Sequence, residues 1–113
     1  MSLQSRRLAL QAQLEGILGS RNVYFQPPAS IFIKYPCIVY SFDGEEVRHS
    51  NNLTYIKRYK FDMTFITKDA EPSDTLSALD SIPYCKLERV YQSDNLHHFS
   101  YKLVVLEEGT NNV

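Results

Sequence analysis

The longest regular pattern in the chain is an alternation of apolar and polar residues over positions 53–67. The even positions are mostly polar, whereas the odd positions carry large apolar side chains interrupted only by Lys57. This alternation predicts a β-strand with one buried and one wetter face. At roughly 3.3 Å per residue the strand would span on the order of 50 Å, more than a small domain needs for its core. We therefore expect part of it to project.

Two segments have the spacing of helices. Residues 4–18 place leucines and an isoleucine on one stripe, and Gly19 supplies a helix stop that tolerates the left-handed conformation. A shorter helix is predicted to begin at Ser73, whose side chain we expect to cap it, and to end before Pro83.

Four further strands are predicted, and their surroundings indicate where they lie. The first ends at a double proline that confines it to an edge of the sheet, and the second is apolar on both faces, as a covered central strand would be. After the second helix, two strands flank a turn at residues 92–95. The four strands are residues 21–26, 37–42, 84–91 and 96–106.

Two polar segments complete the pattern. Residues 43–52 form a connection with turn signals at both ends, which is either a mobile solvent loop or the tip of a contact arm. The tail from Glu107 onward is expected to fray. Together the elements predict one α+β domain over residues 1–113, an antiparallel sheet with two helices on one face in the order α-β-β-β-α-β-β.

Composition narrows the functional classes. Of the 113 residues, 43% are apolar and 22% are charged, as in ordinary globular proteins. The formal charge of −1 argues against a protein whose main task is gripping nucleic acid. No apolar run reaches the roughly 18 residues that a membrane span requires, so no membrane contact is expected.

Residues with catalytic or metal-binding chemistry are scattered. His97 and His98 point to opposite faces of a strand and cannot easily share a metal. Cys37 and Cys85 read as buried, reduced thiols. A small enzyme or ligand-binding domain would have to use Cys85 with His97 or His98 across the turn. We expect no catalytic residue, no metal and no cofactor.

Residues 64–103 carry a series of short motifs. A strand ends in an acidic loop, a Ser/Pro-led helix with leucines follows, and the chain leaves it through Ile-Pro-Tyr-Cys at 82–85. A strand with Arg89 and Tyr91 then leads to Asp-Asn-Leu-His-His at 94–98. This pattern resembles the tail-terminator and head–tail joining proteins, which are minor structural proteins of long-tailed phages and prophages.

The resemblance implies a protein that assembles as a ring, often of six subunits, and carries out no reaction. It would cap the tail tube and face a head-completion or neck protein, in the virion and, during assembly, in the host cytoplasm. DNA would pass through the ring without specific binding, kept from sticking by acids such as Glu45 and Glu46. The candidate inter-subunit arm comprises Asp43, Glu45, Glu46, Arg48, Asn51, Tyr55 and Lys57. The candidate lumen or partner loop comprises Asp69, Glu71 and Asp74.

Three alternatives remain beside the tail terminator. One is a head-completion or neck protein of the stopper type, and another is the small enzyme described above. The third is a general dimeric interaction module unrelated to phages.

Overall fold

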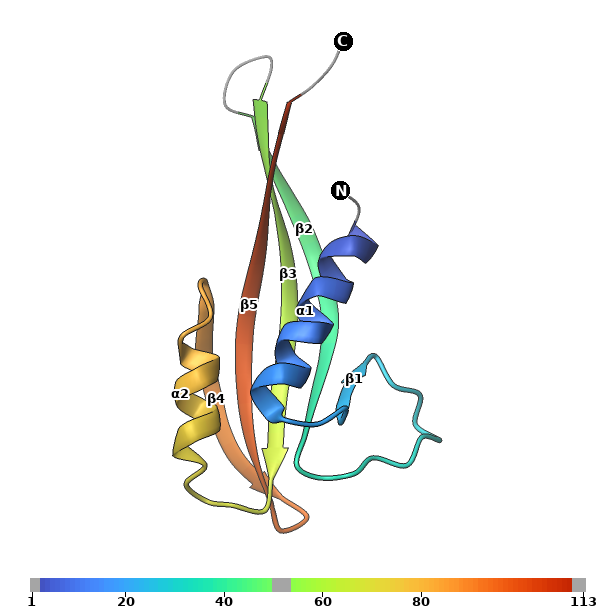
Figure 1. The fold of residues 1–113 in the computed structure, drawn as a ribbon, viewed down its shortest axis with the longest axis vertical. Coiled ribbons are helices and arrows are strands. Elements are labelled where there is room, and N and C mark those ends of the chain that lie inside the picture. The colour runs from blue at the N-terminus through green and yellow to red at the C-terminus, as the bar shows by residue number, and fades with distance from the viewer. Residues whose placement is uncertain (1–2, 50–53, 111–113) are drawn as a thin grey trace.

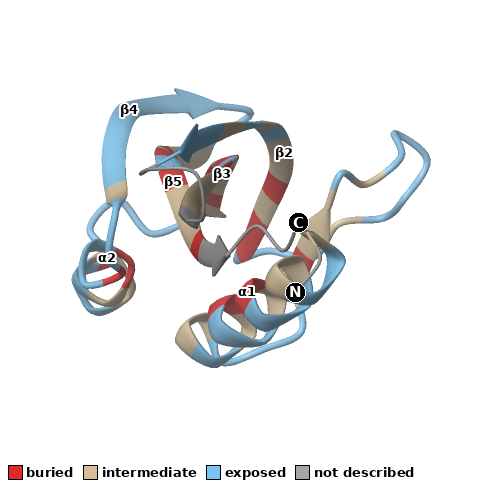
Figure 2. Ribbon diagram, turned by 90° about the horizontal axis from the view of Figure 1, so that it is seen from above, coloured by how far each residue is buried: buried red, intermediate tan, exposed pale blue. Residues whose placement is uncertain are grey.

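The computed structural model describes residues 3–49 and 54–110 and confirms the predicted α+β class and element order. The five strands form one sheet in the order β1-β2-β3-β5-β4, and both helices lie on the same side of it (Figures 1 and 2). The elements are α1 (Leu3–Leu18), β1 (Val23–Phe25), β2 (Cys37–His49), β3 (Thr54–Thr67), α2 (Ser73–Asp80), β4 (Cys85–Ser93) and β5 (Leu96–Thr110).

Strand β3 lies in the centre of the sheet, between β2 and β5. Its odd side chains point toward the helices, as the alternation predicts, and Phe61 and Met63 are almost fully buried. Phe61 is paired with Leu103 of β5 on one side and with Phe42 of β2 on the other. The phenylalanine rings of this second pair meet edge to face, with centroids 5.6 Å apart.

The two helices cover the apolar face of the lower part of the sheet, as it is drawn in Figure 1. Leu10 and Leu14 of α1 and Leu79 of α2 are buried against it, and the buried residues in Figure 2 lie between the helices and the strands. The sheet supplies most of the remaining core: Val23, Ile38, Tyr40, Tyr59, Phe61, Met63, Phe65, Phe99, Tyr101 and Leu103.

Strand β2 is longer than predicted, because it continues to His49 through most of the expected polar connection. Asp43 is the extra residue of a bulge, since Phe42 is paired with Phe61 and Gly44 with Lys60. Gly44 has a φ of +138°, which a residue with a Cβ rarely adopts. The upper part of β2 has little core beneath it, so its polar side chains resemble those of a loop. Residues 50–53 lie outside the described residues.

Strands β1 and β5 also differ from the prediction. Strand β5 extends to Thr110, so the expected frayed tail is strand through that residue. Strand β1 is an edge strand, as its double proline predicts, but it is parallel to β2. A parallel neighbour requires a crossover instead of a tight turn, and residues 26–36 provide it.

The second helix and the strand after it begin differently from the prediction. Pro72 occupies the N-cap of α2, and no side chain caps the helix, so Ser73 is its first residue and not its cap. Strand β4 starts at Cys85 and runs two residues further than expected, to Ser93. The turn to β5 is made by Asp94 and Asn95, which both have positive φ.

A matched pair of leucines in α1 tests whether the helix is held by its buried face. Leu14 has no exposed surface, whereas Leu8 is half exposed. We expect Leu14→Ala to lower the free energy of unfolding by about 2–5 kcal/mol, because it leaves a cavity. Leu8→Ala should change it by less than about 0.5 kcal/mol. Urea denaturation followed by circular dichroism measures both, and equal losses would contradict the packing of α1.

Candidate functional site

The upper part of the sheet consists of three strands that rise past the N-terminal end of α1 (Figure 1). We call this part the arm and define it as residues 43–49, 54–60 and 104–110. Strand β1 is paired with β2 only at residues 38–40, and β4 is paired with β5 only as far as Leu103. The molecule is therefore elongated, 54 Å by 28 Å by 22 Å.

The arm has an open edge on each side within the described residues. Just below the arm, the outer edge of β2 is still covered, because the backbone N–H of Phe42 donates to the Gln26 side chain at 3.0 Å. At the base of the arm on β5, the N–H of Val104 points away from β3 and donates to the carbonyl oxygen of Tyr84 at 3.1 Å. Because backbone groups alternate sides along a strand, the N–H of Leu106 also points away from β3. Unpaired edges of this kind are templates for pairing with another chain.

The face of the sheet without helices carries charged side chains that pair with one another. Glu46 accepts a hydrogen bond from Arg48 Nε at 2.7 Å, and Lys60 Nζ lies 3.6 Å from its other oxygen. The bond from Arg48 holds the pKa of Glu46 below its ordinary value. Lower on this face, the Lys102 ammonium donates to Asp62 and lies 3.9 Å from Asp43.

These pairings change the interpretation of two predicted lumen acids. Glu46 lies opposite Arg58 and Glu45 opposite Tyr59, so successive side chains point to opposite faces. Glu45 and Glu46 cannot line one surface together. Glu46 is also neutralised by its basic neighbours, which weakens the repulsion of DNA that was expected from it.

The face of the arm toward α1 contains a buried carboxylate that the sequence pattern placed in the frayed tail. Glu107 is only 5% exposed and accepts a hydrogen bond from the Tyr59 hydroxyl at 2.7 Å. Arg6 Nε of α1 lies 3.8 Å from the other carboxylate oxygen. The Tyr59 bond lowers the pKa of Glu107, with a further contribution from Arg6. Burial, together with this bond, raises the pKa of Tyr59 to about 12.

The remaining arm candidates lie nearer the tip, on the helix side of the sheet. Tyr55 and Lys57 line a hollow of about 270 Å³ together with Val47 and His49. The Lys57 ammonium lies 5.7 Å from the centroid of the Tyr55 ring. Asn51 lies outside the described residues, so its predicted place in the arm stays a prediction.

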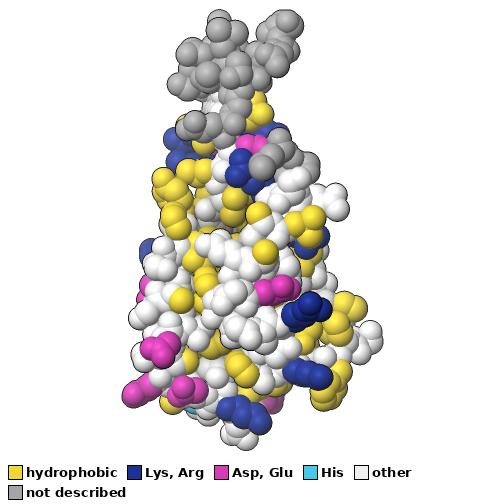
Figure 3. All heavy atoms as spheres, viewed as in Figure 1, with side chains coloured by type: hydrophobic (Ala, Val, Ile, Leu, Met, Phe, Trp, Pro, Cys, Tyr) yellow, Lys and Arg dark blue, Asp and Glu magenta, His cyan; other side chains and the backbone are white. Residues whose placement is uncertain are grey.

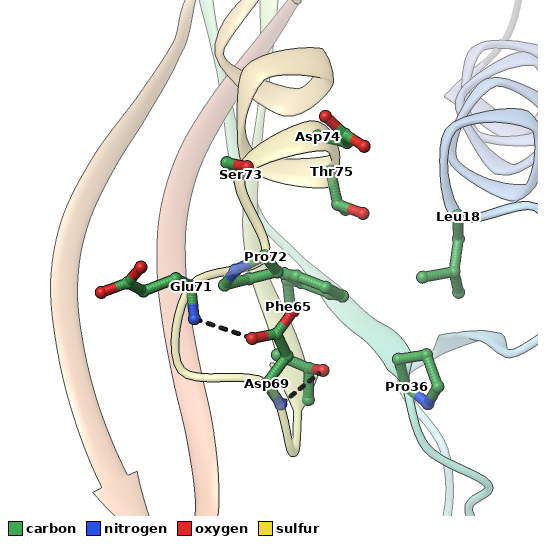
Figure 4. A pocket seen from close by; sticks show the side chains of 10 residues that line it. Leu18, Pro36, Phe65, Asp69, Glu71, Pro72, Ser73, Asp74 and Thr75 are labelled. Carbon is green, nitrogen blue, oxygen red and sulfur yellow. Dashed lines mark hydrogen bonds between the residues drawn. The ribbon is translucent and has the colours of Figure 1, made fainter.

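The second predicted set lies at the opposite end of the sheet from the arm. Asp69, Glu71 and Asp74 border a hollow of about 330 Å³ whose apolar lining includes Leu18 and Phe65 (Figure 4). The loop is held by local bonds. The N–H of Asp69 donates to Thr67 Oγ1 at 3.2 Å, and the N–H of Glu71 donates to Asp69 Oδ1 at 2.9 Å.

The structure separates the residues on which the enzyme alternative depends. Cys85 is opposite Leu103 on β5, six residues from His97, which corresponds to about 20 Å along a strand. Burial raises the pKa of the Cys85 thiol to about 11, which disfavours the reactive thiolate. His98 instead stacks on Tyr91, with ring centroids 4.6 Å apart.

Comparison with known proteins gives no relative from which a function can be transferred: no family model matches the chain, and no curated protein matches it significantly. Among the described residues, no group of three or more histidine, cysteine, aspartate or glutamate side chains is arranged to hold a metal ion. A search of the same residues finds no helix with the length and apolarity needed to cross a bilayer.

Glu107 gives a prediction about pH. Because its folded-state pKa is lowered, its stabilising contribution is complete above its ordinary value of 4.5 and is lost as the pH falls through the folded-state pKa. We therefore expect wild type to exceed Glu107→Gln in free energy of unfolding at pH 7, and the difference to shrink toward pH 3. Urea titrations at both pH values measure it.

Tyr59→Phe tests the same contact from the other side. It removes a hydrogen bond to a charged group, and at pH 7 we expect a loss of about 1.5–3 kcal/mol in the free energy of unfolding. Glu88→Gln is the control for Glu107→Gln, because it makes the same change at an exposed position on β4. A pH-independent difference for Glu107→Gln would show that the ionised carboxylate is not the stabilising species.

Proposed function

We propose that the protein is a phage or prophage virion assembly protein, a tail terminator that caps the tail tube and joins it to the head or neck as a ring of six subunits. The observation that carries this proposal is the arm, with one open strand edge on β2 and another on β5. The resemblance of residues 64–103 to tail-terminator and head–tail joining proteins supports the same function.

The strand directions suit a ring. Strands β2 and β5 are both antiparallel to β3, so they run parallel to each other on the two sides of the arm. A second copy in the same orientation can therefore lay its β2 edge along the β5 edge of the first. Because the two edges differ, the contact is head to tail, and it closes into a ring when the rotation per subunit divides the circle.

The charge distribution suits a ring through which DNA passes without specific binding. The chain has a net charge of −1, and the basic residues Lys60 and Lys102 on the open face are paired with acids. These two ammonium groups are therefore less available to phosphates, the contacts on which non-specific DNA binding depends. The protein would then act through shape and interfaces, with the tail tube protein and a neck protein as its further partners.

A proline on the β5 edge tests the edge-to-edge contact. Leu106→Pro removes an N–H that points away from β3, and proline is tolerated on strand edges. We expect this variant to keep the wild-type fold but to lose the ring, because the parallel pair to the next copy loses a donor. Light scattering over a range of concentrations measures the assembly, and circular dichroism measures the fold.

Two controls distinguish the loss of the edge N–H from the loss of the leucine side chain and from the loss of the fold. Leu106→Ala keeps the N–H and should assemble like wild type. Val105→Pro removes an N–H that points toward β3 and should lower the stability of the monomer itself. A wild-type protein that stops at a dimer would contradict the ring and favour the general interaction module.

A further inference from the structure

The connection from β1 to β2 presents an apolar tip to solvent. Phe32 is 83% exposed, and its neighbours Ile31 and Tyr35 are each more than two fifths exposed. Figure 2 shows the loop extending away from the helices and the sheet, and Figure 3 shows hydrophobic side chains gathered where it projects. The one charged residue of this tip is Lys34. Exposed apolar groups gathered in this way are typical of interaction sites.

The loop is held in this extended form by bonds at its base and within it. Asn22 Nδ2 donates to the carbonyl oxygen of Pro36 at 3.3 Å, and the N–H of Lys34 donates to the Tyr24 hydroxyl at 3.3 Å. The N–H of Ile31 donates to the carbonyl oxygen of Pro28 at 3.1 Å. A tip that is already ordered loses little conformational freedom when it docks.

The hollow at the lower end of the sheet has matching chemistry. Its volume is about 330 Å³, and its lining combines the apolar residues Leu18 and Pro36 with polar residues from the loop after β3 and the first turn of α2. Asp69 and Asp74 lie at its border, and both are exposed (Figure 4). A hollow that combines apolar residues with acids at its border complements an apolar tip that carries one lysine.

We propose that Phe32 of one copy docks in this hollow of the next copy, with Lys34 facing Asp69 and Asp74. The loop ends at Pro36, which itself lines the hollow, while the tip points away from the body, so the tip cannot fill the hollow of its own chain (Figure 1). The contact is head to tail. It rests on the proposed self-assembly and gives the lower body an interface in addition to the arm.

Photo-crosslinking tests this contact directly. Benzoylphenylalanine is placed at position 32 of the full chain, the protein is irradiated at high concentration, and crosslinked peptides are identified by mass spectrometry. We expect intermolecular crosslinks to residues 65–75 or to Leu18. A ring that forms while position 32 crosslinks elsewhere, or to nothing, overturns the docking and leaves the proposed function standing. The expected crosslink in a chain that forms no ring supports the docking and overturns the ring.

Point variants measure how much the proposed contacts contribute to self-association. In sedimentation experiments, Phe32→Ser should weaken self-association at least tenfold, whereas Val90→Ser, at an exposed apolar position on β4, should not change it. Lys34→Glu and Asp74→Lys should each weaken it severalfold, and the double variant should recover most of the loss. An additive double variant overturns the proposed charge contact.

Discussion

Hydrogen bonding of β3 to a strand on each side is the constraint on which the rest of the structure depends. Strand β3 is paired along nearly its whole length with β2 and with β5. In its lower half, this pairing holds Phe61, Met63 and Phe65 in a row that the helices cover. In its upper half, the same pairing continues past β1 and β4. One long strand thus builds both the core and the arm.

The arm can persist beyond the main core because its side chains stabilise one another. On the open face, Glu46 lies between two basic residues, and on the other face Glu107 is held by Tyr59 and Arg6. A buried carboxylate is costly unless it is hydrogen-bonded, so the Tyr59 contact makes the burial of Glu107 tolerable. The Arg6 contact also ties α1 to the base of the arm. A firmly held base keeps the strand edges in place for a partner.

The two proposed contacts lie at different levels of the molecule. The strand edges belong to the arm, whereas the loop with Phe32 and the hollow near Phe65 belong to the lower body (Figure 1). Neither needs a chemical step. Contacts at two heights would fix both the position and the tilt of one copy against the next, which a single strand pair leaves adjustable.

The sequence by itself determined the element types and the buried face, because alternation along residues 53–67 and leucine spacing in α1 follow directly from strand and helix geometry. It did not reveal that residues 43–49 are strand or that Glu107 is buried, although Glu107 continues the alternation of Leu103 and Val105. Polar strands outside the main core look like loops, and their state depends on pairing with distant residues. Tertiary structure alone decided which edges stay open, how far Cys85 lies from His97, and that the loop with Phe32 projects, because each depends on contacts between segments far apart in the chain.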